Sequence, residues 1–324
     1  MRDVYPTMKT WSKAGIRFAL ARVIETWGSA PRPPGAAMIV SEMGQVAGSV
    51  SGGCIEGAVI TEALGCIEDG KRRYCTFGVD SETAWSVGLS CGGQVSVLVQ
   101  PFDPATQVGM QWLARLESGD PLQVRTALEG EDEGIADPQG DATTSLVAGI
   151  FNHLIPRQAR LLIIGGADIA VHLTALAVRL DFEVTVIDPR AVFTDPDRFD
   201  VRPHRLVTAW PQEELGDFAP DNQTFAVLLT HDPRIDDPAL QILLSSRAAY
   251  IGALGGRKTQ TARRDRMRAA GFSEEDLGRI CGPVGLRIGA VGPAEIAASI
   301  AAELVAVRRG VPVREPQSVQ SRNG

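Results

Sequence analysis

Residues 160–190 read RLLIIGGADIAVHLTALAVRLDFEVTVIDPR, and this segment constrains the fold more than any other part of the chain. An apolar run is followed by a tight glycine turn, a helical pattern of about 13 residues and a second apolar run that ends at Asp188. This order predicts two parallel strands joined by a helix, because parallel neighbours need a long crossover connection.

The same alternation continues towards the C-terminus. Further strands are expected at 224–230 and 248–252, and helices at 236–247, 259–271 and 293–309. Strands that alternate with helices form a parallel sheet covered on both faces. We therefore predict a Rossmann-like, doubly wound α/β domain over residues 156–324. Within it, the basic stretch 263–270 is interpreted as a solvated helix face.

Residues 1–155 have a different pattern, which predicts an α+β domain. Helices are expected at 7–15, 55–70 and 106–118, strands at 16–26, 72–77 and 91–102, and a hairpin over 36–50 that turns at 42–45. The acidic stretch 129–144 is rich in Gly and Asp, which favours a surface loop or the tip of a hairpin.

Composition restricts the partners and the compartment. The chain of 324 residues has 39 acidic and 32 basic side chains and a net charge of −7, which argues against nucleic acid as the main partner. Five cysteines without a CxxC pair do not suggest a disulfide framework. The sequence shows no signal peptide and no run of roughly 20 apolar residues. We expect a cytoplasmic protein with reduced thiols and no membrane span.

The glycine turn after the first strand of the C-terminal domain has the position of a dinucleotide fingerprint. Gly165 and Ala170 fit the first and third small positions, whereas Ala167 stands where a second glycine lets pyrophosphate approach. Asp188 follows at the distance of a ribose-binding acid. Two interpretations stay open: the turn binds a nucleotide such as NAD(P), or it serves packing alone.

Other residues at the carboxyl ends of the predicted strands belong to the same candidate site, because open α/β sheets bind ligands there. His231 and Asp232 could line a cleft, with helix capping by Asp232 or Asp236 as the alternative. Arg257 could meet a phosphate or lie in a solvated turn. The full set of candidate nucleotide-binding residues is Gly165, Gly166, Ala167, Asp168, Asp188, Arg190, His231, Asp232 and Arg257.

Two cysteines of the first domain each adjoin a Gly-Gly pair. Cys54 follows Ser51-Gly52-Gly53 at the start of a predicted helix, where backbone N–H groups can bind an anion and the helix dipole favours a thiolate. Cys91 precedes Gly92 and Gly93 on a second glycine turn. The alternative is that each cysteine is simply a small buried residue. Zinc is disfavoured, because none of the four histidines lies at ligand spacing from a cysteine.

With these residues in view, the chain resembles the XdhC/CoxI family, accessory proteins that mature molybdenum hydroxylases such as xanthine dehydrogenase. The resemblance covers most of the chain and rests on blocks at 27–40, 48–59, 91–101, 160–190, 228–240, 250–259 and 285–303. The glycine turn, Gly256 and Arg287 depart from the usual family pattern.

The resemblance implies a chaperone, without catalysis of its own, that binds molybdenum cofactor, holds it for sulfuration and inserts it into the apo-hydroxylase. It also implies a cysteine desulfurase as sulfur donor and a homodimer. The site residues expected for molybdopterin are Ser51, Gly52, Gly53, Cys54, Glu56, Cys91, Gly92, Gly93 and Arg32. Cys54 and Cys91 are hypothetical molybdenum ligands.

Two functions of other classes compete with this one. An NAD(P)-dependent oxidoreductase would use the C-terminal domain for its cofactor, and a regulatory protein would sense a nucleotide there. The sequence shows no evident acid pair for hydride transfer, and Ala167 narrows the phosphate approach, so both are kept as alternatives.

Overall fold

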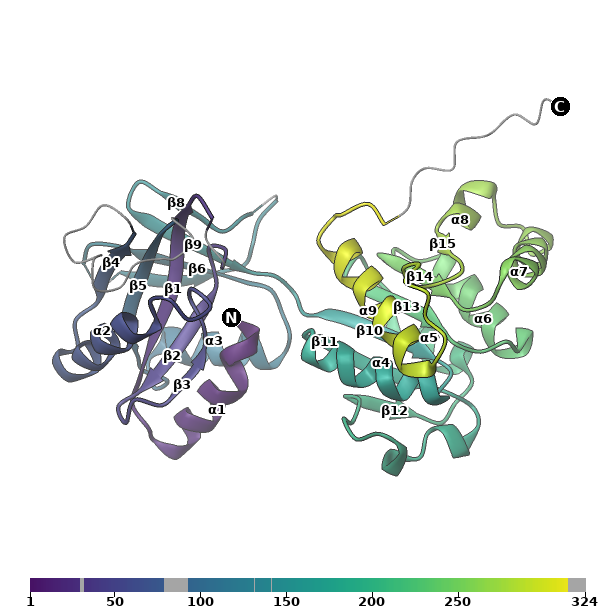
Figure 1. The fold of residues 1–324 in the computed structure, drawn as a ribbon, viewed down its shortest axis with the longest axis horizontal. Coiled ribbons are helices and arrows are strands. Elements are labelled where there is room, and N and C mark those ends of the chain that lie inside the picture. Colours follow the sequence, from purple (N-terminus) through teal and green to yellow (C-terminus); the bar gives the residue numbers. More distant parts are fainter. Residues whose placement is uncertain (30–31, 79–92, 131, 141, 314–324) are drawn as a thin grey trace. The chain divides into compact units, whose positions relative to one another are not determined.

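The computed structural model describes residues 1–29, 32–78, 93–130, 132–140 and 142–313. The chain divides into two compact units, Met1–Arg157 and Gln158–Gly324 (Figure 1).

A five-stranded antiparallel sheet forms the centre of the first unit. Its strands are β1 (Phe18–Trp27), β2 (Ala37–Ser41), β3 (Val46–Gly48), β4 (Arg73–Phe77) and β5 (Gln94–Phe102), in the order β3-β2-β1-β5-β4. Side chains alternate between the two faces of a strand. Ala19, Ala21 and Val23 of β1 therefore pack against α2 (Glu56–Asp69), whereas Phe18 and Leu20 belong to a second core on the opposite face.

The second core also contains side chains of α1 (Tyr5–Ala14), α3 (Gln107–Glu117) and a small second sheet. This four-stranded sheet consists of β6 (Leu122–Ala127), β7 (Glu133–Ala136), β8 (Ser145–Val147) and β9 (Ile150–Ile155), in the order β7-β6-β9-β8. This second sheet was not predicted from the sequence. The stretch 129–144, taken there as a loop or hairpin tip, contains all of β7.

A fully buried arginine links the two sheets. Arg22 of β1 is 0% exposed, and its Nη2 donates to Gln100 Oε1 at 2.7 Å, Thr126 Oγ1 at 3.0 Å and Glu133 Oε1 at 3.2 Å. The guanidinium lies over the rings of Trp112 and Phe151. Burial lowers the pKa of Arg22 to about 10, with Glu133 acting in the opposite direction, so this side chain stays charged at neutral pH.

The second unit confirms the prediction of a doubly wound α/β domain. Its six strands are all parallel and are β10 (Ala159–Ile164), β11 (Phe182–Ile187), β12 (Arg205–Val207), β13 (Thr224–Leu228), β14 (Tyr250–Ala253) and β15 (Ile280–Cys281). The strand order is β12-β11-β10-β13-β14-β15. From β10 the chain first adds strands on one side, β11 and β12, and then crosses to the other side of β10 to add β13, β14 and β15. Ligands of such sheets bind near the carboxyl ends of the strands at this point.

Helices cover both faces of this sheet (Figure 1). On one face lie α4 (Asp168–Arg179) and α9 (Pro293–Arg308), and on the other lie α5 (Pro211–Phe218), α6 (Pro233–Leu244), α7 (Arg257–Ala269) and α8 (Glu274–Gly278). The interpretation of 263–270 as a solvated face is wrong for Arg263, which is 1% exposed and ion-paired with Asp236.

Candidate functional site

The loop before α2 turns sharply at two glycines. Gly52 and Gly53 have φ angles of +81° and +125°, a region that side chains with a Cβ rarely adopt. The chain then enters α2 at Glu56, with Ile55 as N-cap and Cys54 directly before it. The glycine pair thus places Cys54 at the helix start.

The carboxylate of Glu56 folds back into this loop and accepts five hydrogen bonds. Its Oε1 receives Ser49 Oγ at 2.6 Å, Ser51 N at 2.9 Å and Gly52 N at 3.1 Å. Its Oε2 receives Ser51 Oγ at 2.5 Å and Gly53 N at 2.8 Å. Burial alone would raise the pKa of Glu56, but the hydrogen bonds from Ser49 and Ser51 lower it to about 2.

Ser51 extends this network to the cysteine. While its hydroxyl donates to Glu56, the same oxygen accepts from Cys54 N at 3.0 Å and from Ile55 N at 3.1 Å. Cys54 is half-buried and packs at the margin of the core around α2. The structure therefore brings together Ser51, Gly52, Gly53, Cys54 and Glu56 of the predicted set.

This geometry corrects the expectation that the loop is an open anion cradle. The N–H groups of Ser51, Gly52 and Gly53 are the donors expected to bind phosphate, and each already donates to Glu56. Ser49, which the sequence analysis did not name, supplies a further donor from the same serine-rich loop. A phosphate could enter only by displacing a carboxylate of this chain.

The remaining predicted members of the site lie elsewhere or are not described. Arg32 forms an ion pair with Asp3, Nη2 to Oδ2 at 3.3 Å, so its guanidinium has a partner in the N-terminal segment. A Cβ on Gly93 would meet the backbone of Ser29 and Trp27 at 3.0 Å, so this glycine allows close packing. Cys91 and Gly92 lie outside the described residues, so the expectation that Cys54 and Cys91 belong to one site stays a prediction.

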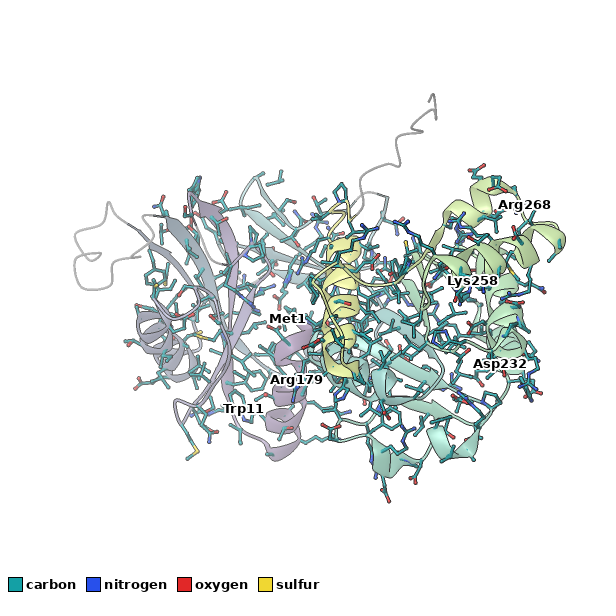
Figure 2. The ribbon with its side chains drawn as sticks, turned by 45° about the vertical axis from the view of Figure 1, so that its right-hand side comes forward. Met1, Trp11, Arg179, Asp232, Lys258 and Arg268 are labelled. Atoms are coloured by element: carbon teal, nitrogen blue, oxygen red, sulfur yellow. The ribbon has the colours of Figure 1, made fainter. Side chains whose placement is uncertain are left out.

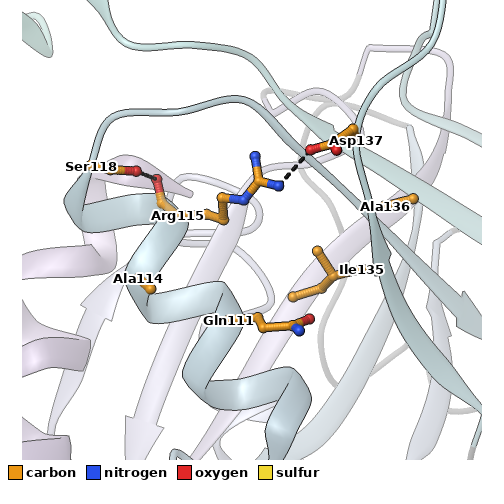
Figure 3. Close-up of a pocket in the computed structure, with 7 residues that line it drawn as sticks. All are labelled: Gln111, Ala114, Arg115, Ser118, Ile135, Ala136 and Asp137. Carbon is orange, nitrogen blue, oxygen red and sulfur yellow. Dashed lines mark hydrogen bonds and ion pairs between the residues drawn. The ribbon is translucent and has the colours of Figure 1, made fainter.

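Three cavities of the first unit lie away from this loop. One of about 510 Å³ lies between α3 and β7, where Arg115 Nη2 and Asp137 Oδ1 are 2.5 Å apart (Figure 3). Another, of about 740 Å³, is lined by residues of the α2 C-terminus, β5 and α3, including Lys71, Gln100 and Thr106. The third, of about 400 Å³, lies beside β6 and β7. None of these three contains a predicted site residue.

In the second unit the glycine turn is closely covered by its own chain. A Cβ on Gly166 would lie 2.3 Å from the carbonyl oxygen of Phe193, and one on Gly165 would lie 2.5 Å from Cγ2 of Thr230. The guanidinium groups of Arg190 and Arg198 both lie over the Phe193 ring, at 4.2 and 5.1 Å from the ring centre. Of the two interpretations of this turn, its contacts favour packing.

Asp188 is bonded within the same turn. It is 0% exposed and accepts from Gly166 N at 2.9 Å and from Arg190 N, Nε and Nη2 at 2.7–2.9 Å. Burial would raise the pKa of this carboxyl, but the bonds from Arg190 and Gly166 lower it overall. The geometry therefore argues against the ribose role that Asp188 would have if the turn bound a nucleotide. Ala167 is the N-cap of α4, and Asp168 pairs with Arg198 at 3.0 Å.

The other candidates follow neighbouring strands of the sheet. His231 is exposed after β13, and Asp232 caps α6 and binds Arg234 at 2.6 Å (Figure 2). The hydrogen bond from Arg234 lowers the pKa of Asp232 to about 2. Arg257 is exposed in the first turn of α7, next to Lys258 (Figure 2). The capping alternative thus holds for Asp232.

A buried polar network supports these strand ends, and the sequence analysis missed it. Asp236 of α6 accepts from Thr230 Oγ1 at 2.5 Å and from Arg263 Nη2 at 2.9 Å. Gln260 accepts from Arg263 and donates to the carbonyls of Ala253 and Gly255. Nothing in the sequence of the HDPRIDD segment or of the basic stretch of α7 indicated that Asp236 and Arg263 would form a buried ion pair.

Comparison with known proteins identifies the family. Residues 11–78 match the XdhC and CoxI family, and residues 161–304 match the XdhC Rossmann domain. The chain is 30% identical over 300 residues to the molybdenum cofactor insertion chaperone PaoD of Escherichia coli K12, an alignment that covers 91% of this chain and 85% of that protein.

The chain belongs to the XdhC and CoxI family.

Two further proteins are similar to this XdhC and CoxI family member over almost its whole length. It is 27% identical to a Bacillus subtilis protein described as a probable xanthine dehydrogenase subunit, over 91% of this chain and 94% of that protein. A crystal structure from Bacillus halodurans, described as a xanthine dehydrogenase, superposes with a TM-score of 0.79 over 97% of this chain and 98% of the other at 24% identity, which supports the fold.

Neither a clustered metal site nor a membrane-spanning helix is found in the described part of this family member. Among those residues, no three or more His, Cys, Asp or Glu side chains are grouped as a metal site. In the same residues no helix has both the length and the apolar character needed to cross a bilayer.

Proposed function

We propose that this protein takes part in the maturation of a molybdenum hydroxylase, binding molybdenum cofactor as its cargo and inserting it into the apo-enzyme. The observation that carries the proposal is the similarity to an insertion chaperone along 91% of the chain. The cysteine-bearing loop before α2 has a chemistry that suits that cargo.

The cargo is a phosphorylated pterin that carries molybdenum on a dithiolene. Thiolate is a soft ligand and suits such a metal better than carboxylate or imidazole. Cys54 lies at a loop that is held in one conformation by seven hydrogen bonds to Glu56 and Ser51. We propose that Cys54, together with Cys91, contacts the metal-bearing end of the cargo while its terminal oxo ligand is exchanged for sulfur.

The proposed partners follow from this role. They are the apo-hydroxylase that receives the cargo and a cysteine desulfurase that supplies the sulfur, with a homodimer as the proposed assembly. A nucleotide in the second unit is not part of the proposal, because Phe193 and Arg190 occupy the surroundings of the glycine turn.

The test is retention and transfer of the pterin. Wild-type protein, Cys54→Ala and Cys91→Ala are purified from cells that make molybdopterin, and bound pterin is measured as its fluorescent oxidation product. Near-stoichiometric pterin is expected for wild type, together with activation of an apo-hydroxylase, and a loss of both is expected for the variants.

Cys75→Ala is the matched control, because Cys75 of β4 is also half-buried but lies outside the loop, and burial raises the pKa of its thiol to about 11. This variant should retain pterin as wild type does. Absence of pterin and of transfer in wild type, with NADH-dependent turnover of a carbonyl compound instead, would favour an oxidoreductase.

A further inference from the structure

The loop of Cys54 has the donor set of a phosphate site, but this chain fills it. Three backbone N–H groups and the hydroxyls of Ser49 and Ser51 converge on one point, and the Glu56 carboxylate occupies it at distances of 2.5–3.1 Å. Both carboxylate oxygens are used, one with three donors and the other with two. Glu56 is also the acid in the first turn of α2, where it complements the helix dipole.

We propose that Glu56 is a positioning residue that fixes Cys54 and keeps phosphate out of the loop, so that the metal-bearing end of the pterin, and not its phosphate, meets Cys54. This inference rests on the proposed function and adds the orientation of the cargo to it.

The exclusion of phosphate follows from charge. A phosphate placed among these N–H groups would lie beside the Glu56 carboxylate, and two like charges at hydrogen-bonding distance repel each other strongly in a partly desolvated loop. The five donors that would stabilise a phosphate are the same five that already stabilise Glu56. An external anion gains nothing unless Glu56 leaves.

The positioning role follows from the relay through Ser51. Its hydroxyl can accept from Cys54 N and Ile55 N in this orientation because its own proton is directed to Glu56 Oε2. Removing the carboxylate frees the hydroxyl to rotate and takes the Glu56 acceptor away from the N–H groups of Gly52 and Gly53. The backbone of Cys54 then loses its fixed place while its side chain stays half-buried.

The experiment compares full-length wild type with Glu56→Ala, Glu56→Gln and Glu68→Gln. Inorganic phosphate is titrated while the amide resonances of Gly52 and Gly53 are followed, and the alkylation rate of Cys54 by iodoacetamide is measured by mass spectrometry, with Cys75 as internal reference. In wild type, phosphate should leave both amides and the rate unchanged.

In Glu56→Ala, alkylation should be roughly tenfold faster, because the relay through Ser51 no longer holds the backbone of Cys54 and its side chain opens more often to the reagent. Phosphate should then shift both amides saturably and slow alkylation again. Glu56→Gln keeps an acceptor oxygen for some of the donors, should fold if Glu56→Ala does not, and should react at an intermediate rate. Glu68 is exposed near the end of the same helix, so Glu68→Gln should match wild type.

Saturable shifts of the Gly52 and Gly53 amides by phosphate in wild type would overturn the proposal, and so would wild-type alkylation rates in both Glu56 variants. These measurements do not need the pterin. If wild type retains no pterin, the proposed function fails, and with it the orientation of the cargo, while the phosphate and alkylation results still decide the role of Glu56.

Discussion

The glycine turns before α2 and α4 begin their helices in a similar way but differ in what remains accessible beside them. In both, a carboxylate of the same chain binds N–H groups of the turn: Glu56 in the first unit and Asp188 in the second. Asp188 is 0% exposed and bound to Arg190, whereas Glu56 is half-buried beside the half-buried Cys54. A glycine turn with the sequence pattern of a phosphate site can therefore have its N–H groups bonded to a carboxylate of the same chain. Its function then depends on which reactive side chain remains accessible beside it.

The largest expected effect is on the closed turn of the second unit. Gly166→Ala would place a Cβ 2.3 Å from a backbone oxygen of Phe193. Such overpacking against backbone should lower the free energy of unfolding of this unit by about 3 kcal/mol. Amide hydrogen exchange of peptides from β10 and β11, followed at increasing urea concentration, reports the unfolding free energy of the second unit separately from that of the first.

Gly57→Ala is the control for this substitution. Gly57 lies in α2 with no neighbouring heavy atom within 4 Å of the position that a Cβ would take, so alanine should stabilise the helix by up to about 1 kcal/mol. Wild-type stability in Gly166→Ala would mean that Phe193 does not cover the turn.

A smaller loss is expected from Asp188→Ala. The substitution leaves the buried Gly166 N–H without its acceptor and frees Arg190, which is exposed enough to be solvated. An unsatisfied buried donor and the lost ion pair should together cost roughly 2 kcal/mol. The same urea-dependent exchange measures it, and a nucleotide that binds wild type but not this variant would restore the ribose role.

The half-buried carboxylate of the first unit should matter less for stability. Glu56→Gln removes the acceptor for about two of the five donors, because an amide nitrogen cannot accept them. We expect a loss of about 1 kcal/mol, measured by urea denaturation against Glu68→Gln. A loss as large as that in Asp188→Ala would mean that the two turns depend equally on their carboxylates.

The smallest effect is the pH dependence of that contribution. The pKa of Glu56 is about 2 in the folded protein and lies below the usual value of an unfolded glutamate, about 4.3. A lowered folded pKa stabilises above the unfolded pKa, and the gain is lost as pH falls from about 4.3 towards 2. The stability difference between wild type and Glu56→Gln should shrink over this range by at most about 1 kcal/mol, since solvent screens a half-exposed carboxylate. A difference that does not change with pH would contradict the lowered pKa.

Regular periodicity explains why much of the fold was predictable. The βαβ segment at 160–190 and the later alternation predicted the doubly wound sheet, because buried parallel strands are continuous apolar runs. The short strands β6 to β9 were missed. β7 has the sequence EGIA, which includes a charged residue and a glycine and forms no apolar run. It also lies in the acidic stretch that was expected to be a loop.

The candidate site was predictable in its position but not in its bonding. The sequence GSVSGGCIEG placed a cysteine at a helix start, as the structure has it. It could not show that Glu56 would turn back on the loop instead of facing solvent, because both outcomes suit an acid in a first helical turn. Arg263 was likewise misjudged, since its pairing with Asp236 is long-range and leaves no periodic trace.

Arg22 determines where this chain can be divided. Its guanidinium lies on the face of the five-stranded sheet that is opposite to α2, and its carboxylate partner, Glu133, follows 111 residues later. A fragment that ends after β5 would lack α3 and the second sheet, so it would expose the apolar face that these elements cover and should be insoluble or unfolded. Residues 11–78 match the family model, but we do not expect them to fold when they are transferred to another protein. Truncation or chimera work should keep residues 1–157 as one piece.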